Sequence, residues 1–159
     1  RAYAIAGAAA ALSAGAQICG GLLVGRVRRL FRRRTDALLL GGLVGVLLLA
    51  GLAAANSLWI ALVLIGVWSL VGAATSPLRQ SFLNGLIPSA QRATVLSFDS
   101  LMGSSGGVVA QPVLGRVADV SGYAASYLVA GGVYALALPF TWLARRERAS
   151  SDPIDSADA

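Results

Sequence analysis

Two long apolar segments joined by an arginine-rich linker constrain this chain more than any other feature. The linker, residues 21–36 (GLLVGRVRRLFRRRTD), holds six of the thirteen basic residues, and all thirteen are arginine. Residues 2–25 before it and residues 37–55 after it are each long enough to cross about 30 Å of hydrocarbon as a helix. Because guanidinium groups stay in water, the positive-inside rule makes the linker a cytoplasmic turn. A basic loop of a soluble protein is disfavoured, since no soluble fold explains such apolar runs on both sides.

The composition also favours a membrane protein. Hydrophobic residues make up 57% of the 159 residues and charged residues only 13%, whereas soluble domains carry about 25% charged residues. A net charge of +6 would favour nucleic-acid binding in a soluble protein, but here the arginines lie at the ends of apolar segments. We therefore expect a multi-pass protein of the cell membrane, surrounded by the lipid bilayer and without a nucleic-acid partner.

Apolar length and turn residues predict an all-α, polytopic transmembrane helix bundle with five spans in residues 1–148. The expected helices cover approximately residues 2–25, 37–55, 58–80, 90–120 and 124–144. Only Arg1 and Arg116 fall on the proposed outer side, which places the N-terminus outside and the C-terminus in the cytoplasm. Residues 149–159 are small, acidic and polar, and we expect a disordered cytoplasmic tail there. Because the chain starts with arginine rather than methionine, we also expect a fragment of a longer protein.

Small residues recur every four positions in two of the expected helices. The two series are Gly7, Ala11, Gly15 and Cys19 near the N-terminus, and Gly103, Gly107 and Gly115 further along the chain. Such faces let two helix backbones approach closely in lipid, where association depends on packing. Pro112 lies within the second series and allows a bend in that helix. We expect these residues to serve in helix packing.

A carboxylate lies on the same face as the second glycine series. Asp99 is roughly two helical turns in from Arg92, which places it within the membrane near the inner side. An intramembrane carboxylate is costly, and it points to the bundle interior or to a wet cavity. Two interpretations remain open: Asp99 is a proton or cation relay, or it is an acid neutralised by Arg79 or Arg92.

Polar side chains within the apolar segments define a candidate substrate or proton pathway. The candidate residues are Asp99, Gln111, Gln17, Ser69, Ser76 and Ser104. Gln17 either lines a polar cavity or hydrogen-bonds a neighbouring helix, and both alternatives direct it inward. Trp68 lies in mid-span and either stacks on a substrate or packs against lipid or the bundle.

The second expected helix has a polar start and an apolar body. Thr35 or Asp36 can cap its N-terminus while offsetting the neighbouring arginines. Residues 37–55 carry no polar side chain, so we expect this helix to face lipid over much of its circumference.

Three stretches of the sequence resemble the major facilitator superfamily of transporters. Residues 21–29 (GLLVGRVRR) resemble the degenerate second copy of the family's G-x-L-a-D-R-x-G-R-R loop between helices eight and nine, matched by Gly21, Gly25, Arg26 and Arg29. Gly25 replaces the acidic residue of that pattern, and Arg28 stands where the pattern has glycine. Residues 84–97 (NGLIPSAQRATVLS) resemble the link between helices ten and eleven, and residues 111–122 (QPVLGRVADVSG) resemble the end of helix eleven.

The resemblance covers residues 1–148 and implies the C-terminal portion of such a transporter, helices eight to twelve. It implies alternating access between two bundles, with the N-terminal helices of the same protein as the missing partner. The implied activity is secondary active transport, namely export of a small-molecule substrate with protons as the coupling ion.

Two other function classes deserve comparison with transport. A membrane-embedded interaction or scaffold subunit without transport activity would use the small-residue faces alone, and intramembrane Asp99 and Gln111 argue against it. A membrane enzyme is disfavoured because the chain has no histidine, one cysteine and no H-E-x-x-H or phosphate-binding glycine loop. We expect no enzymatic activity, no metal site and no cofactor.

Overall fold

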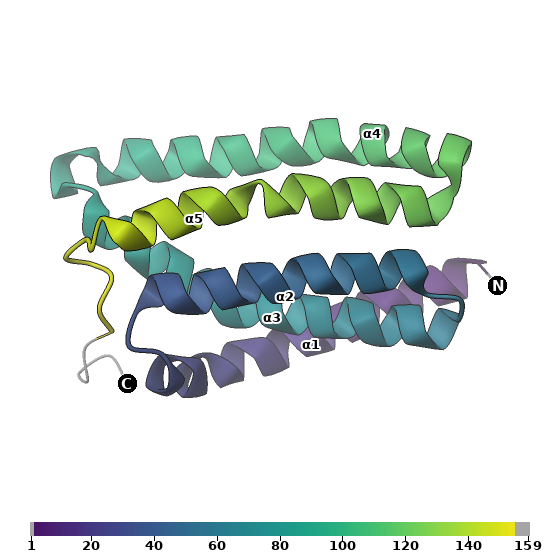
Figure 1. Ribbon diagram of the computed structural model, residues 1–159, viewed down its shortest axis with the longest axis horizontal. Coiled ribbons are helices and arrows are strands. Elements are labelled where there is room, and N and C mark those ends of the chain that lie inside the picture. Colours follow the sequence, from purple (N-terminus) through teal and green to yellow (C-terminus); the bar gives the residue numbers. More distant parts are fainter. Residues whose placement is uncertain (1, 155–159) are drawn as a thin grey trace.

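The computed structural model describes residues 2–154, which form helices and contain no β-strand. The helices are α1 (Ala2–Leu30), α2 (Arg34–Ala54), α3 (Leu58–Leu86), the short 3₁₀ helix η1 (Ser89–Gln91), α4 (Arg92–Ala135) and α5 (Ala137–Arg146). They lie roughly antiparallel, with the α1–α2 and α3–α4 connections at one end of the bundle and the α2–α3 connection at the other (Figure 1). Four segments are long and apolar enough to cross a membrane: Gly7–Leu30, Arg34–Ala54, Leu58–Leu86 and Ser89–Arg146.

The last of these segments doubles back on itself at Gly122. This residue has φ +86° and ψ 164° inside α4, a backbone conformation that is open to glycine and rare for other residues. The part of α4 before Gly122 runs along the bundle, and the part after it returns together with α5 (Figure 1). The reversal falls in the gap between the expected helices 90–120 and 124–144, while the count of five membrane spans stays a prediction.

Two helices continue past their expected ends on the arginine-rich side. α1 reaches Leu30 rather than residue 25, and α3 reaches Leu86 rather than residue 80. Arginine is a good helix former, and the basic last turn of α1 interacts favourably with the partial negative charge at a helix C-terminus. Bilayer thickness sets the minimum apolar length and does not end the helix. The family-like residues Gly21, Gly25, Arg26 and Arg29 therefore lie in α1 and not in a loop.

Packing within the described residues centres on α2 and α3. α1 packs on α3, while α2 contacts α3, α4 and α5. The buried apolar side chains come from α2 and α3: Ala37, Leu49, Leu52, Ala74, Leu78 and Phe82. α2 is thus a central helix, although Leu40, Leu43 and Leu47 on one side of it are exposed. Because lipid is as apolar as a protein core, the apolar sequence of α2 did not distinguish these two environments.

The C-terminal segment, which we expected to be disordered over 149–159, is held in place as far as residue 154. We call residues 149–154 the C-terminal clasp. The Asp152 side chain is 1% exposed, and its carboxylate accepts hydrogen bonds from the Thr35 N–H (2.9 Å) and the Thr35 hydroxyl (3.0 Å). The Ser151 hydroxyl donates to the Phe82 carbonyl at 3.2 Å. Residues 155–159 of the expected tail lie outside the described residues.

The clasp is ordered because α2 begins without a cap of its own. Arg33 at the N-cap position makes no side-chain hydrogen bond to the helix, so the first N–H groups of α2 need another acceptor. Asp152 supplies it, and its negative charge suits the partial positive charge at a helix N-terminus. Arg34 adds hydrogen bonds to the carbonyls of Ser151 and Pro153. The expected caps, Thr35 and Asp36, lie inside α2, where Asp36 pairs with Arg145 at 2.6 Å.

Candidate functional site

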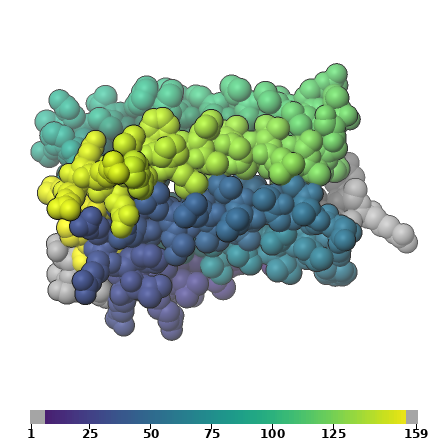
Figure 2. Space-filling view, in the orientation of Figure 1, coloured from purple at the N-terminus to yellow at the C-terminus, as the bar shows by residue number. Residues whose placement is uncertain are grey.

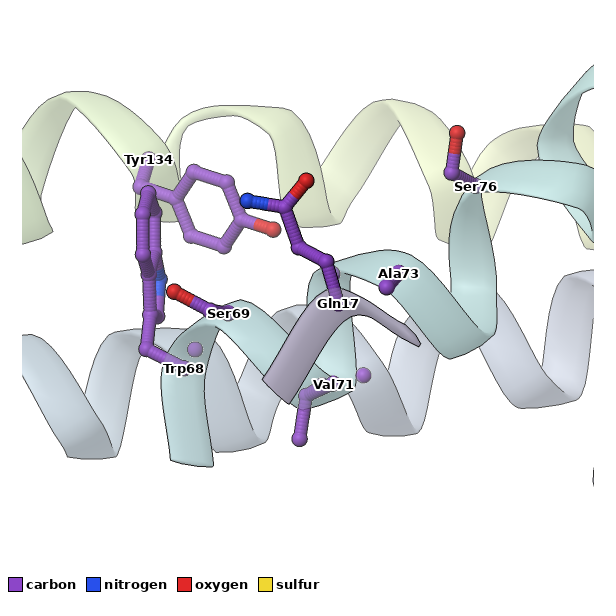
Figure 3. A pocket seen from close by; sticks show the side chains of 10 residues that line it. Gln17, Trp68, Ser69, Val71, Ala73, Ser76 and Tyr134 are labelled. Carbon is purple, nitrogen blue, oxygen red and sulfur yellow. The ribbon is translucent and has the colours of Figure 1, made fainter. Parts of the chain in front are cut away.

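A polar cavity of about 330 Å³ lies among α1, α2, α3 and the returning part of α4. Its walls include three of the side chains predicted for a substrate pathway, Gln17, Ser69 and Ser76. Figure 3 shows Gln17, Trp68, Ser69 and Tyr134 around one end of the cavity, with Ser76 further along α3. The structure therefore brings residues from widely separated parts of the sequence to one place.

Helical spacing and one close helix crossing create this cavity. Ser69 and Ser76 are seven residues apart on α3, so they lie on the same face of that helix. α1 crosses α3 at Gly20, where an added Cβ would lie 2.5 Å from the Leu70 carbonyl oxygen and 2.7 Å from the Ala73 Cβ. This contact brings Gln17, almost one turn earlier on α1, to the rim of the α3 face.

The polar groups of the cavity are available to a ligand or to water. Within residues 7–154, the side chains of Gln17, Ser69, Ser76 and Tyr134 make no hydrogen bond to another protein group. Together they offer an amide and three hydroxyls, which both donate and accept hydrogen bonds. The cavity lining contains no charged side chain.

A second, apolar cavity of about 720 Å³ adjoins the first between α2, α3 and both parts of α4. Aliphatic side chains such as Leu49, Ile65 and Val113 line it. Trp68 and Tyr134 contribute to the walls of both cavities. Ser126 also lines the second cavity, but its hydroxyl is already used, since it donates to the Leu114 carbonyl at 2.9 Å and links the two parts of α4.

Asp99 lies apart from both cavities and is paired with an arginine. Arg79 on α3 donates to both carboxylate oxygens, with distances of 2.6 and 3.1 Å. The two side chains are 53% and 37% exposed, so they form a partly exposed, two-point ion pair between α3 and α4. This geometry agrees with the interpretation in which Arg79 neutralises Asp99.

The remaining predicted residues of α4 do not reach the polar cavity. Gln111, Ser104 and Pro112 are exposed, and an added Cβ at Gly103, Gly107 or Gly115 would meet nothing within 4 Å. Gly115 lines the apolar cavity only. The described part of the chain therefore leaves this small-residue face of α4 uncovered. The same holds for Gly7 and Gly15 on α1.

Sequence reasoning missed Tyr134, which belongs to both cavities. Its ring packs where an added Cβ on Gly45 would lie, 2.6 Å from the nearest ring carbon. The available signal was its position: Tyr123 and Tyr127 fit an interfacial belt, whereas Tyr134 lies deeper in an otherwise apolar segment.

A comparison with protein-family models identifies the chain. The model of the Major Facilitator Superfamily matches residues 2–159. The chain belongs to the major facilitator superfamily. Neither the curated proteins nor the solved structures gave a match. Members of this superfamily are membrane transporters and not enzymes, which accords with the four long apolar segments.

Membership gives the helical bundle a functional context. A major facilitator is a multi-pass membrane protein that handles small-molecule substrates, so the helices described here cross a lipid bilayer. The resemblance inferred from the sequence is thereby confirmed at the level of the family.

Proposed function

We propose that this chain forms part of a secondary active transporter that exports small molecules in exchange for protons. The observation that carries the proposal is the polar cavity, where Gln17, Ser69 and Ser76 present hydrogen-bonding groups with no partner in residues 7–154. Polar groups within membrane bundles commonly mark a substrate or ion pathway. A volume of about 330 Å³ lies at the lower end of the range for small-molecule sites.

Alternating access is the proposed mechanism, in which two helical bundles rock about a site near the middle of the membrane. The second bundle would come from helices that precede this segment, as the family resemblance implies. The open small-residue faces support this arrangement, because glycines without neighbours within 4 Å leave room for close, sliding contact. These faces are formed by Gly7 and Gly15 on α1 and by Gly103 and Gly107 on α4.

We assign proton coupling to Asp99. Protonation of its carboxylate would remove the charge that holds Arg79 and would loosen the link between α3 and α4. Since α3 carries Ser69 and Ser76, proton occupancy at Asp99 would then change the shape of the polar cavity.

The proposed orientation has the arginine-rich end in the cytoplasm of the cell and the N-terminus of the segment outside. The connections at residues 31–33 and 87–91 and the C-terminal clasp all lie at this end (Figure 1). The positive-inside rule supports the assignment, because this end carries the arginines at 26, 28, 29, 32, 33 and 34.

Everted membrane vesicles with an acidic lumen provide the test. Proton-coupled export predicts that a transported solute, added from a panel of neutral and charged small molecules, dissipates the pH gradient reported by an amine dye. The Asp99→Asn variant should be expressed normally and lose this response. Asp119→Asn, which alters an exposed carboxylate on the same helix, is the matched control and should keep it. A solute response that persists in Asp99→Asn would remove Asp99 from the mechanism, and no response to any solute would contradict export.

A scaffold subunit is the second candidate function, and one observation favours it. The uncovered glycine faces of α1 and α4 would also suit a permanent contact with another membrane chain. This function predicts stable co-purification with such a chain and no solute-dependent loss of the pH gradient.

A further inference from the structure

Two cavities of different chemistry share a wall formed by Trp68 and Tyr134. The smaller cavity, about 330 Å³, presents the Gln17 amide and the hydroxyls of Ser69 and Ser76. The larger one, about 720 Å³, is lined almost entirely by aliphatic and aromatic carbon. In Figure 3 the two aromatic rings stand beside Ser69 and Gln17 at the end of the polar cavity. A molecule bound across this wall would meet polar groups at one end and apolar groups at the other.

Neither cavity has a charged side chain in its lining. The pair nearest to serving as a counter-charge, Arg79 and Asp99, lies outside both linings, and each of these charges already faces the other. An ionic ligand would lose its hydration without gaining an opposite charge, which is strongly unfavourable in an apolar environment. A neutral polar group, by contrast, would find the donors and acceptors that the polar cavity offers.

The aromatic wall favours a ligand with a ring. Trp68 and Tyr134 are both 41% exposed, so their faces are accessible from the cavities. Rings stack on such faces in offset or edge-to-face geometry, which adds to the gain from burying apolar area. The volume of the larger cavity is ample for a bicyclic ring system.

We infer that the site binds an uncharged aromatic amphiphile, with its ring in the larger cavity and a hydroxyl or amide head in the smaller one. The inference rests on the proposed function for its biological meaning, because it names the substrate class of that same site. Binding itself requires no transport and is measured separately.

The test uses Trp68 as the only tryptophan, with Trp59→Phe and Trp142→Phe in the whole chain purified in detergent. Three probes share one dansyl ring and differ in the charge of the head: N-(2-hydroxyethyl)dansylamide, N-(2-aminoethyl)dansylamide and dansylglycine. Energy transfer from Trp68 to the dansyl group reports binding. The neutral probe should bind at least about tenfold more tightly than either charged probe. Equal affinity for the three probes, or tighter binding of a charged one, would overturn the inference.

A pair of matched variants separates the site from partition into the micelle. Gln17→Leu removes the polar head's partner at nearly constant size and should weaken binding of the neutral probe about fivefold to tenfold. Gln80→Leu makes the same change at an exposed position outside both linings and should leave the affinity unchanged. If both variants bind the neutral probe like the parent, the assigned site is wrong. Selective neutral binding without any solute-dependent loss of the pH gradient would contradict export alone, whereas export of charged solutes only would contradict the substrate class alone.

Discussion

The Asp152 carboxylate accepts hydrogen bonds from the N–H and hydroxyl of Thr35, 117 residues away in the sequence. Both residues are at most 1% exposed, so water cannot replace either partner without opening the structure. A short C-terminal segment thus completes the N-terminus of α2. Asp152 therefore contributes to stability even though it lies outside every apolar segment.

Replacing Asp152 by alanine should lower the stability of the helix bundle. Loss of an N-cap acceptor costs about 0.5–2 kcal/mol, and a buried N–H left unsatisfied costs about 1–3 kcal/mol. The midpoint of thermal unfolding, followed by circular dichroism in detergent, should fall. Asp119→Ala at an exposed position is the control and should leave the midpoint unchanged. An unchanged midpoint for Asp152→Ala would show that the clasp does not stabilise α2.

Gly122 is the second residue whose chemistry decides a local structure. Its φ of +86° with ψ near 164° is a combination that only glycine adopts without strain, and no atom lies within 4 Å of the site where a Cβ would be added. Gly122→Ala should therefore destabilise the protein by about 1–3 kcal/mol through the backbone alone. Gly103→Ala, in an equally open helical position, should be neutral or slightly stabilising in the same unfolding experiment. Equal midpoints for the two variants would contradict a reversal of the chain at Gly122.

At the scale of helices, the crossing of α1 and α3 depends on the absence of a side chain at Gly20. Gly20→Ala would place a methyl group 2.5 Å from the Leu70 carbonyl oxygen, on rigid backbone that cannot yield. Overpacking of this kind costs about 1–3 kcal/mol, and it should also move Gln17 away from the polar cavity. Gly21→Ala, the adjacent position with nothing within 4 Å, should alter neither unfolding nor binding of the neutral dansyl probe. A Gly20→Ala variant that behaves like Gly21→Ala would contradict the packing of α1 on α3.

Sequence patterns predicted the helices well and their partners poorly. Apolar runs and the Ser121–Gly122–Tyr123 turn located the helices and the reversal, because length and turn chemistry are local properties. They did not separate the crowded glycine, Gly20, from the open ones, since small-residue spacing does not say which neighbour approaches. The order of residues 149–154 was missed because the acceptor that α2 lacks comes from a distant part of the chain.

The candidate site was predicted in part for the same reason. Ser69 and Ser76 share one face of a helix, so their joint position in the polar cavity follows from spacing. The presence of Gln17 and Tyr134 in that cavity depends on how α1 and the returning part of α4 pack on α3, which only the tertiary structure defines. Asp99 had two open interpretations, and the Arg79 ion pair agrees with the structural one.

At the scale of the whole molecule, charge and apolar length together organise the bundle. Arginines gather at the end of the bundle that carries the α1–α2 and α3–α4 connections and the C-terminal clasp, while the α2–α3 connection and the reversal at Gly122 lie at the opposite end (Figure 1). Figure 2 shows the side chains of the returning part of α4 and of α5 in contact with those of α2 along the molecule. In a bilayer this arrangement would keep every guanidinium cluster on one side.

Labelling with a membrane-impermeant maleimide measures this arrangement directly. Single cysteines would replace Arg32, Arg92 and Asn56 in turn, in a background where the exposed Cys19 is serine. In sealed everted vesicles, cysteines at positions 32 and 92 should both react, and the cysteine at position 56 should react only after the vesicles are opened. Reaction of positions 32 and 92 from opposite sides of the membrane would contradict the account.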